Sequence, residues 1–495
     1  MGDILYERCI FQKNSIHYFS TLDFSVQICH NVVELQFLGG FVMNHLKQLP
    51  ERSFLKLFFF LFSFSFVLAA FFMPDRQDML PGLLRILQNP TLASTNAFSI
   101  GGYAATFLNM GLLGLICSAL YCIPGTTPAG PSVLAVILTV GFGSWGIHVL
   151  NVWPTMLGVV LYCIVRKKPL GNYTHLMLLT TGLAPFISEI LVRYPYDQVV
   201  PITPARILLA LAIGIAAGFT IPAGIKNAPT VHRGLTVYSA ALPVGMAAFL
   251  MYSVLYKVMG VPVPGAVSDL HVASAGIVNT FCCILFGLCV LGALLLGCRP
   301  RDYWKLMIDP EVVTNFSATY GNAVMLMNVG MFGFFILGYY NLIGAEFNGV
   351  TFGVIFCMLC TCNAGSHPLN VLPIMLGYAL ITWLFQLVAP IAHGNFTLYL
   401  NAQAIIVGLC YANGLSLLSD KYGWFWGMLS AILHYCMVTT TPLVHGSMCL
   451  YNGGFTTGLV CLLLMPTLEK IVDPKLVRRA LRKKAKQQTS GSEVK

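Results

Sequence analysis

Long apolar runs follow one another along almost the whole chain, and they restrict its fold more than any other feature. A run of ~20 apolar residues is long enough to cross a bilayer as a helix. Charged residues make up only 9% of the 495 residues, which is too few for an ordinary soluble domain. We therefore predict an all-α polytopic membrane protein. Seven apolar segments lie in each half: 54–73, 97–122, 129–145, 150–165, 174–192, 205–223 and 234–257, then 270–298, 320–343, 349–362, 368–388, 400–418, 423–441 and 447–466.

One polar stretch inside these runs occurs twice. Residues 142–158 read FGSWGIHVLNVWPTMLG, and residues 363–377 read NAGSHPLNVLPIMLG. His148 and Asn151 return as His367 and Asn370, both at an offset of 219 residues. Gly and Asn loosen a helix and Pro can start a new one, so the pattern predicts an interrupted helix. The preceding segments, 129–145 and 349–362, are short for a full span, and we expect half-helices around two breaks that face each other in the membrane.

The repeat extends over nearly the whole membrane region, with offsets that change slowly along the chain. The matching positions are Thr95-Asn96 with Thr314-Asn315, Gly102, Asn109, Gly111 and Gly114 with Gly321, Asn328, Gly330 and Gly333, Gly130 with Gly349, Ala184-Pro185 with Ala389-Pro390, and His232, Tyr238 and Gly245 with His445, Tyr451 and Gly458. Ordered blocks of this kind indicate a duplication. We expect the repeated glycines to permit close helix packing.

The duplication divides the chain into two membrane repeats, residues 54–258 and 259–468. A cytoplasmic arm, 1–53, precedes them and a basic cytoplasmic tail, 469–495, follows. Met43 is an alternative start, in which case residues 1–42 are a gene-calling artefact.

Lys and Arg are distributed unevenly between the loops, which predicts the orientation. With the start of segment 54–73 inside, the inside loops hold most of the basic residues: Arg166, Lys167, Lys168, Lys226, Arg233, Arg299, Arg301, Lys305 and Lys421. This positive-inside bias places both termini in the cytoplasm of a cell with the protein in its plasma or inner membrane. An odd number of spans per half then gives two inverted repeats, an architecture of many transporters.

Several stretches resemble a bacterial family of multi-pass membrane proteins known only as domain of unknown function 1576. They are residues 101–109, 142–158, 217–222 (AGFTIP) and 232–238, and they lie in the same order over residues 55–468. One departure is Ile147-His148, where the family has a Gly-Lys pair before the Asn. The resemblance implies the fold and no activity. A weaker likeness, of architecture only, is to urea channels.

The polar residues of the two breaks are the candidate site. We expect Ser144, His148, Asn151, Ser366, His367 and Asn370 to line a central aqueous site for a small anion or neutral polar solute, with half-helix N-termini directed at it. The alternative is that they cap the half-helices and bond across the repeat. Asn109 and Asn328 make interhelix bonds or line the pore. Glu189, followed one turn later by Arg193, and the two histidines are candidates for proton or ion coupling.

The remaining motifs favour a transporter over other classes. The sequence has no catalytic signature, and we predict no cofactor, no metal site and no nucleic-acid partner. Sixteen cysteines lie mostly in apolar runs, where Cys packs as a small hydrophobe. We expect membrane lipid and a small solute as partners, and a homo-oligomer is possible. A urea-channel-like passive channel is the first alternative, and an intramembrane enzyme or scaffold subunit is the second.

Overall fold

Helices form all the regular structure in residues 45–263, 265 and 274–472, the part of the chain that the computed structural model describes. The expectation for residues 1–42 lies outside this part. The helices of the first half are α2 (Glu51–Ala70), α3 (Met79–Gln88), α4 (Ala97–Leu120), α5 (Gly130–Phe142), α6 (Trp153–Val165), α7 (Thr174–Thr180), α8 (Ala184–Val192), α9 (Pro204–His232) and α10 (Ala241–Tyr252).

The second half repeats this order of helices. It contains α11 (Ala275–Leu295), α12 (Pro300–Ile308), α13 (Phe316–Tyr320), α14 (Asn322–Leu342), α15 (Gly349–Leu359), α16 (Pro368–Val388), α17 (Gln403–Ala412), α18 (Ser416–Tyr422), α19 (Trp424–Val438), α20 (Thr441–Val444) and α21 (Asn452–Ile471). Each of the fourteen predicted apolar segments coincides with one or more of these helices.

Nine helical stretches among the described residues are long and apolar enough to cross a bilayer. Large apolar side chains stand exposed on their outer faces, including Leu208, Leu250 and Leu288. Such faces suit lipid rather than water. The prediction of an all-α polytopic membrane protein is therefore confirmed. The two short segments are also short in the structure, as α5 and α15.

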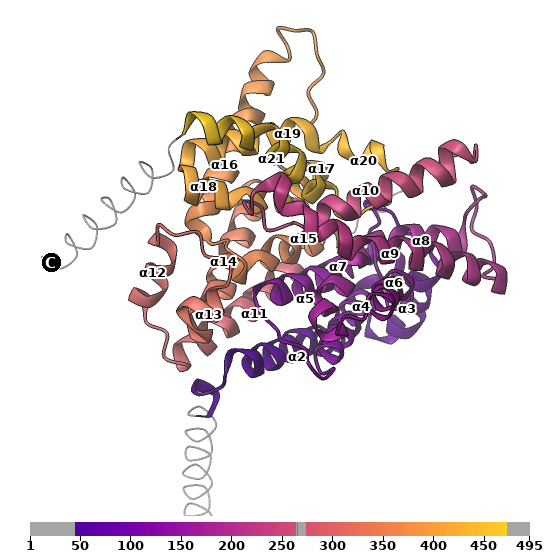
Figure 1. Ribbon diagram of the computed structural model, residues 1–495, viewed down its shortest axis with the longest axis horizontal. Coiled ribbons are helices and arrows are strands. Elements are labelled where there is room, and N and C mark those ends of the chain that lie inside the picture. The colour runs from indigo at the N-terminus through magenta and orange to yellow at the C-terminus, as the bar shows by residue number, and fades with distance from the viewer. Residues whose placement is uncertain (1–44, 264, 266–273, 473–495) are drawn as a thin grey trace, which may run out of the picture.

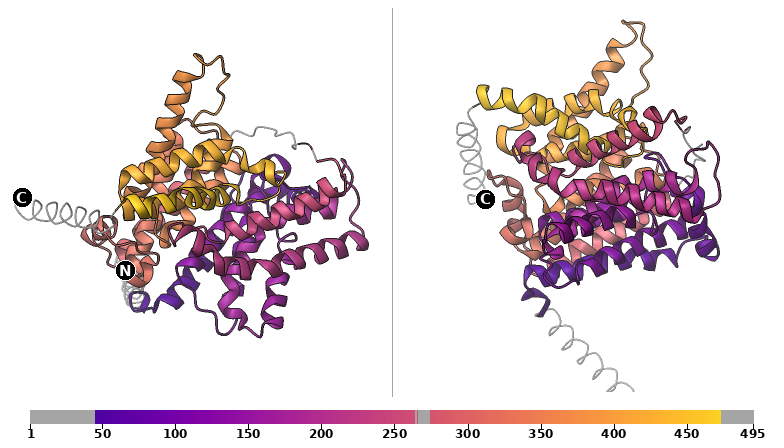
Figure 2. Two further views of the ribbon diagram at one scale, coloured as in Figure 1. Left: turned by 45° about the horizontal axis from the view of Figure 1, so that its top comes forward. Right: turned by 45° about the vertical axis from the view of Figure 1, so that its right-hand side comes forward.

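The two halves repeat the same helix contacts. Helix α2 packs on α4 as α11 packs on α14, and α6 packs on α9 as α16 packs on α19. The halves also interlock, because α5 packs on α15 and α10 packs on α21. Figures 1 and 2 show the result: the first half, indigo to magenta, and the second, orange to yellow, lie side by side, and α10 reaches the yellow helices.

Glycines allow the closest of these helix contacts, as expected. A Cβ atom on Gly330 of α14 would lie 2.5 Å from Val290 Cγ2 and 2.8 Å from the Phe286 carbonyl oxygen on α11. A Cβ atom on Gly111 of α4 would lie 2.7 Å from the backbone nitrogen of Val67 on α2. Small residues thus bring the backbones of paired helices together in both halves.

Two of the repeated glycines have a different role from the expected one. Gly102 has φ +84° and Gly321 has φ +93°, so both interrupt their helices instead of packing against a neighbour. Only glycine adopts this backbone without strain. In the first half the Asp75 carboxylate accepts hydrogen bonds from the new N-terminus, at 2.7 Å from Tyr103 N and 3.0 Å from Ala104 N. The repeat therefore contains a second pair of helix breaks.

A third pair of breaks corrects the proposed alignment of the two Ala-Pro motifs. Ala184 begins α8, whereas Ala389 follows the end of α16, so these motifs are not equivalent. The features that correspond to each other are the 3-10 turns that directly precede α8 and α18. They are η3 (Thr181–Leu183) and η6 (Asn413–Leu415). Each turn is only three residues long and has a glycine at its centre, Gly182 or Gly414. So short a match carries too little sequence information for the equivalence to be recognised.

We predict opposite effects for two alanine substitutions on α14. Gly330→Ala should lower the free energy of unfolding by about 1–3 kcal/mol, because the new methyl group has no space beside α11. Gly338→Ala, on the same helix with no atom within 4 Å of the added Cβ, should be neutral or stabilising. Thermal unfolding in detergent measures both. Equal effects of the two substitutions would contradict the close contact.

Candidate functional site

Each central break leaves backbone groups that its own helices cannot satisfy. Helix α5 ends at Phe142 and α6 begins at Trp153. In the second half, the 3-10 turn η5 (Cys360–Asn363) follows α15, and α16 begins at Pro368. In a lipid environment such groups need partners within the protein, in water or in a ligand.

Two asparagines supply these partners in the same way. Asn109 Nδ2 donates to the carbonyl oxygens of Gly143, at 2.7 Å, and Ile147, at 2.9 Å. Asn328 Nδ2 donates to those of Cys362, at 2.7 Å, and Ser366, at 3.0 Å. The asparagine and its two acceptor residues in the first half are each separated by 219 residues from their counterparts in the second half. Both asparagines are fully buried, and their amides connect α4 and α14 to the two breaks. Pore lining by these asparagines stays a prediction.

The histidines and asparagines of the breaks form equivalent caps. Asn151 Oδ1 accepts from His148 N, and Asn370 Oδ1 accepts from His367 N, each at 2.9 Å. The second amide atoms reach different groups: Asn151 Nδ2 donates to Ser188 Oγ and Asn370 Nδ2 donates to Asp420 Oδ2, each at 2.8 Å. The halves therefore have a neutral hydroxyl at one cap and a carboxylate at the other.

The predicted site residues are buried and largely engaged with their own halves. His148 Nδ1 faces Leu150 N at 3.3 Å, and its Nε2 lies 3.2 Å from Ser188 Oγ. Ser144 Oγ donates to the Gly141 carbonyl oxygen at 3.0 Å, and Ser366 Oγ lies 3.1 Å from Ser416 Oγ. His367 Nδ1 is buried without a partner among the described residues. His148, Ser188 and Asn151 therefore form one hydrogen-bonded group.

Each break lies beside the start of the other half's short helix. The Ser144 carbonyl oxygen of the first break lies beside Gly349, the first residue of α15, because a Cβ atom on this glycine would be 2.6 Å from it. The same oxygen accepts from Ala97 N at the start of α4, at 3.1 Å. In the other half, a Cβ atom on Gly130 would lie 3.3 Å from the Asn363 carbonyl oxygen. Each short helix thus begins beside one break and ends at the other.

A cavity of about 410 Å³ reaches the second break through Ala364. None of the eight predicted site residues lines it. Its other lining residues come mainly from the start of α5, from α7, and from the end of α9 with the loop that follows: Pro131, Leu134, His175, Leu176, Leu179, Ile225, Pro229, His232, Gly234, Thr236, Val237, Tyr238, Ser239, Ala240, Ala241, Thr314, Asn315, Leu417 and Tyr451. Five of the lining residues belong to the repeated pairs, and this repetition was the available sequence signal: His232, Tyr238, Thr314, Asn315 and Tyr451.

The equivalent place in the first half holds a bulky side chain. Trp145 occupies the position that corresponds to Ala364 and is 0% exposed. A Cβ atom on Gly353 of α15 would lie 2.4 Å from Trp145 Cδ1, which shows how tightly the indole packs. The backbone of Ala93 also donates to the Ser447 carbonyl oxygen there, at 2.8 Å. The two breaks therefore have equivalent backbones, but only the second one borders a cavity.

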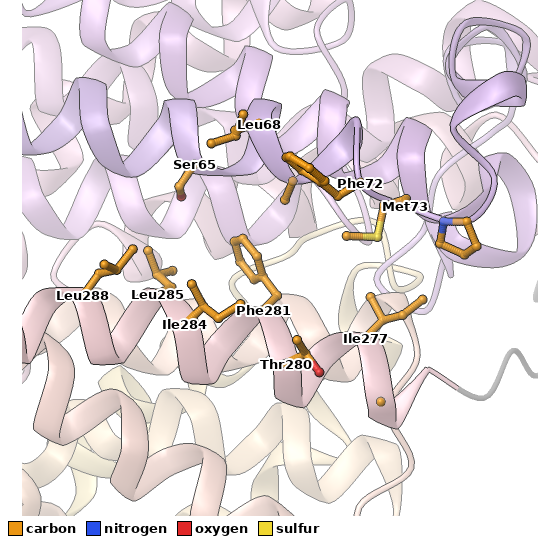
Figure 3. Close-up of a pocket in the computed structure, with 13 residues that line it drawn as sticks. Ser65, Leu68, Phe72, Met73, Ile277, Thr280, Phe281, Ile284, Leu285 and Leu288 are labelled. Atoms are coloured by element: carbon orange, nitrogen blue, oxygen red, sulfur yellow. The ribbon is translucent and has the colours of Figure 1, made fainter. Parts of the chain in front are cut away.

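A larger cavity, of about 580 Å³, lies on the outside between α2 and α11. Leu68 of α2 and Phe72, just after the end of α2, face Phe281 and Ile284 of α11 across it (Figure 3). Phe72 is 75% exposed and Ile284 is 57% exposed. An apolar groove open along two membrane helices suits lipid, and it offers little to a polar solute.

Glu189 and Arg193 form a buried ion pair near the end of α8. Both carboxylate oxygens accept hydrogen bonds from the guanidinium, at 2.8 Å and 2.7 Å, and the side chains are 1% and 8% exposed. A buried pair of this geometry satisfies the carboxylate at a high cost in desolvation. In the second half, Lys421 occupies the position that corresponds to Glu189, so the ion pair is not duplicated. Its coupling role stays a prediction.

Nine apolar spans in the described part of the chain, together with duplicated halves and interrupted helices at the centre, define a polytopic helical membrane protein. The sequence matches a family described as a protein of unknown function (DUF1576) over residues 75–257 and 300–470, and the chain belongs to this family. The predicted resemblance is thus confirmed. No curated protein and no solved structure matches the sequence.

We predict that the amide of Asn328 is needed for the second break to fold. Asn328→Asp keeps the shape but directs an oxygen at two carbonyl oxygens, so the free energy of unfolding should fall by roughly 2–5 kcal/mol. Asn341→Asp, at an exposed position on the same helix, should change it far less. Thermal unfolding in detergent compares the two. A harmless Asn328→Asp would show that the break does not depend on this amide.

Proposed function

We propose that this protein carries a small polar solute across the membrane as a secondary transporter, with the cavity beside the second break as its binding site. One observation carries the proposal. Two equivalent helix breaks differ in that Ala364 lines a cavity whereas Trp145 is packed solidly. A site accessible on one side of a duplicated structure is what alternating access requires.

The charge distribution supports an inverted orientation of the halves. Helices α5 and α15 then enter the membrane from opposite sides, and the cavity faces the cytoplasm together with the basic end of α9 at Lys226 and Arg233. Transport would exchange the open arrangement at Ala364 with the closed one at Trp145. Gly234, the counterpart of Ser447, lines the cavity and would make the closing contact in the other state.

A passive channel is less well supported by the packing. A channel needs a continuous path, and the side opposite the cavity is filled by fully buried Phe142, Trp145 and Leu450. A transporter needs only one open side at a time.

Asp420 is the best candidate for proton coupling. It lies on α18, its Oδ2 atom accepts from Asn370 at the second break, and the first half has a neutral serine in this place. Glu189, His148 and His367 are the other candidates. Of these, Glu189 is held on both oxygens by Arg193, and His148 is engaged by Ser188. A carboxylate at only one of two equivalent caps suits coupling better than a structural role.

We predict that filling the cavity stops transport. Ala364→Trp introduces the residue that the first half already has, so the fold should survive while uptake into proteoliposomes falls to background. Ala364→Ser should retain uptake. The assay is a screen of radiolabelled small anions, neutral solutes and amino acids. Full uptake by a folded Ala364→Trp protein would exclude this cavity as the route, and no uptake of any solute by the native protein would count against transport.

We predict that Asp420→Asn removes the response to a pH gradient. The native protein should accumulate solute when the gradient is imposed, and the variant should only equilibrate it, because it has lost the group that binds and releases the proton. Ser188→Ala, at the equivalent cap, should keep the response. A gradient response that survives in Asp420→Asn and is lost in Glu189→Gln, or in His148→Ala with His367→Ala, would move the coupling role to those residues.

A further inference from the structure

His232 presents a hydrogen-bond donor that the protein does not use. It lies at the end of α9, where Arg233 has φ +52° and Gly234 has φ +73°, and this turn brings Gly234 N to 3.1 Å from His232 Nδ1. Because Nδ1 accepts this bond, the neutral ring carries its hydrogen on Nε2. His232 is 1% exposed and lines the cavity, yet Nε2 has no partner among the described residues. A buried donor without an acceptor is costly, so a solute oxygen is its natural partner.

The start of α5 adds a second source of positive potential to the same cavity. Pro131, in the first turn of this helix of 13 residues, lines the cavity. The N-cap residue, Ala129, has no side chain that can accept from the first turn, and Ser132 Oγ accepts only from Ala129 N, at 3.1 Å. The equivalent helix α15 is capped: Asn348 Oδ1 accepts from Val350 N and Thr351 N, and Asn96 Oδ1 accepts from Gly349 N at 2.9 Å. An uncapped helix N-terminus attracts anionic groups. Of this equivalent pair, the helix start that borders the cavity thus lacks the side-chain acceptors that the other one has.

The rest of the lining fits a short hydrocarbon chain. Among the described residues that line the cavity there is no Asp or Glu, whereas Leu134, Leu179 and Ile225 contribute apolar surface. Two described carboxylates contact the surroundings of the cavity. Glu51 accepts from Asn315 Nδ2 at 3.1 Å and from Ser317 Oγ at 2.7 Å, and Glu469 pairs with Arg233, the neighbour of His232, at 3.3 Å. A volume of about 410 Å³ is at the lower end of the range for small-molecule pockets.

From these observations we infer that the cavity binds a small organic carboxylate, with the carboxylate at His232 Nε2 and the start of α5 and the hydrocarbon part against the leucines. This names the substrate class of the transport function proposed above and rests on it for the step of translocation. Binding itself depends only on the cavity. A neutral amide of equal size can accept from His232 Nε2 through its carbonyl oxygen, but it then places an NH₂ donor against the start of α5 and lacks the negative charge that this helix end favours. An amine would place its positive charge there, so both should bind poorly.

Calorimetric titration of the purified full-length protein tests this inference with three probes of equal length, butyrate, butyramide and butylamine. Only butyrate should bind. His232→Leu removes the donor and should weaken butyrate binding roughly tenfold or more, whereas His232→Gln keeps an N–H group and should retain part of the affinity. His445→Leu, the counterpart in the second half, whose two ring nitrogens are buried outside this cavity, should bind as the native protein does.

Three results would overturn the inference: no butyrate binding, equal binding of all three probes, or equal losses in His232→Leu and His445→Leu. The outcomes also separate it from the transport proposal. Butyrate binding without uptake of any solute supports the inference and contradicts transport. Uptake of a neutral or cationic solute, with no butyrate binding, supports transport and contradicts the inference.

Discussion

Interrupted helices in an apolar surrounding leave peptide groups that must be satisfied, and this constraint shapes the whole protein. A continuous helix satisfies its own backbone, but a broken one depends on side chains from elsewhere. Asn109 and Asn328 meet this need at the central breaks, each with two hydrogen bonds to carbonyl oxygens. Their identical geometry in two halves explains how a break can be a stable and repeated feature.

The same constraint ties the halves to each other. Asn96 of the first half accepts from Gly349 N at the start of α15. Leu450 N donates to the Gly182 carbonyl oxygen at 3.0 Å, and Val237 N donates to that of Gly414 at 3.4 Å, so each half closes a 3-10 turn of the other. Each half satisfies its central break with its own asparagine, but it needs the other half to complete its 3-10 turn, so we expect the halves to fold together.

Sequence reasoning succeeded where local chemistry and spacing coincide. Gly, His, Asn and Pro at a constant offset marked the central breaks, and the shortness of 129–145 and 349–362 marked the half-helices. It misread Gly102 and Gly321, because a glycine that packs and a glycine with positive φ look alike in one sequence. It also chose the conspicuous polar residues of the breaks, whereas the cavity adjoins Ala364 and His232, which only the packing of α5, α7 and α9 brings together.

In the proposed topology, equivalent parts of the two halves lie on opposite sides of the membrane. Thr127 and Glu346 test it directly, because both are exposed, lie in the loops before α5 and α15, and differ by the 219 residues of the repeat. Each is replaced by cysteine in a background without other reactive cysteines and labelled with a membrane-impermeant maleimide on intact cells and inverted vesicles. The account predicts that Thr127→Cys reacts only in inverted vesicles and Glu346→Cys only on intact cells. Labelling of both from the same side would contradict the inverted arrangement and the transport cycle built on it.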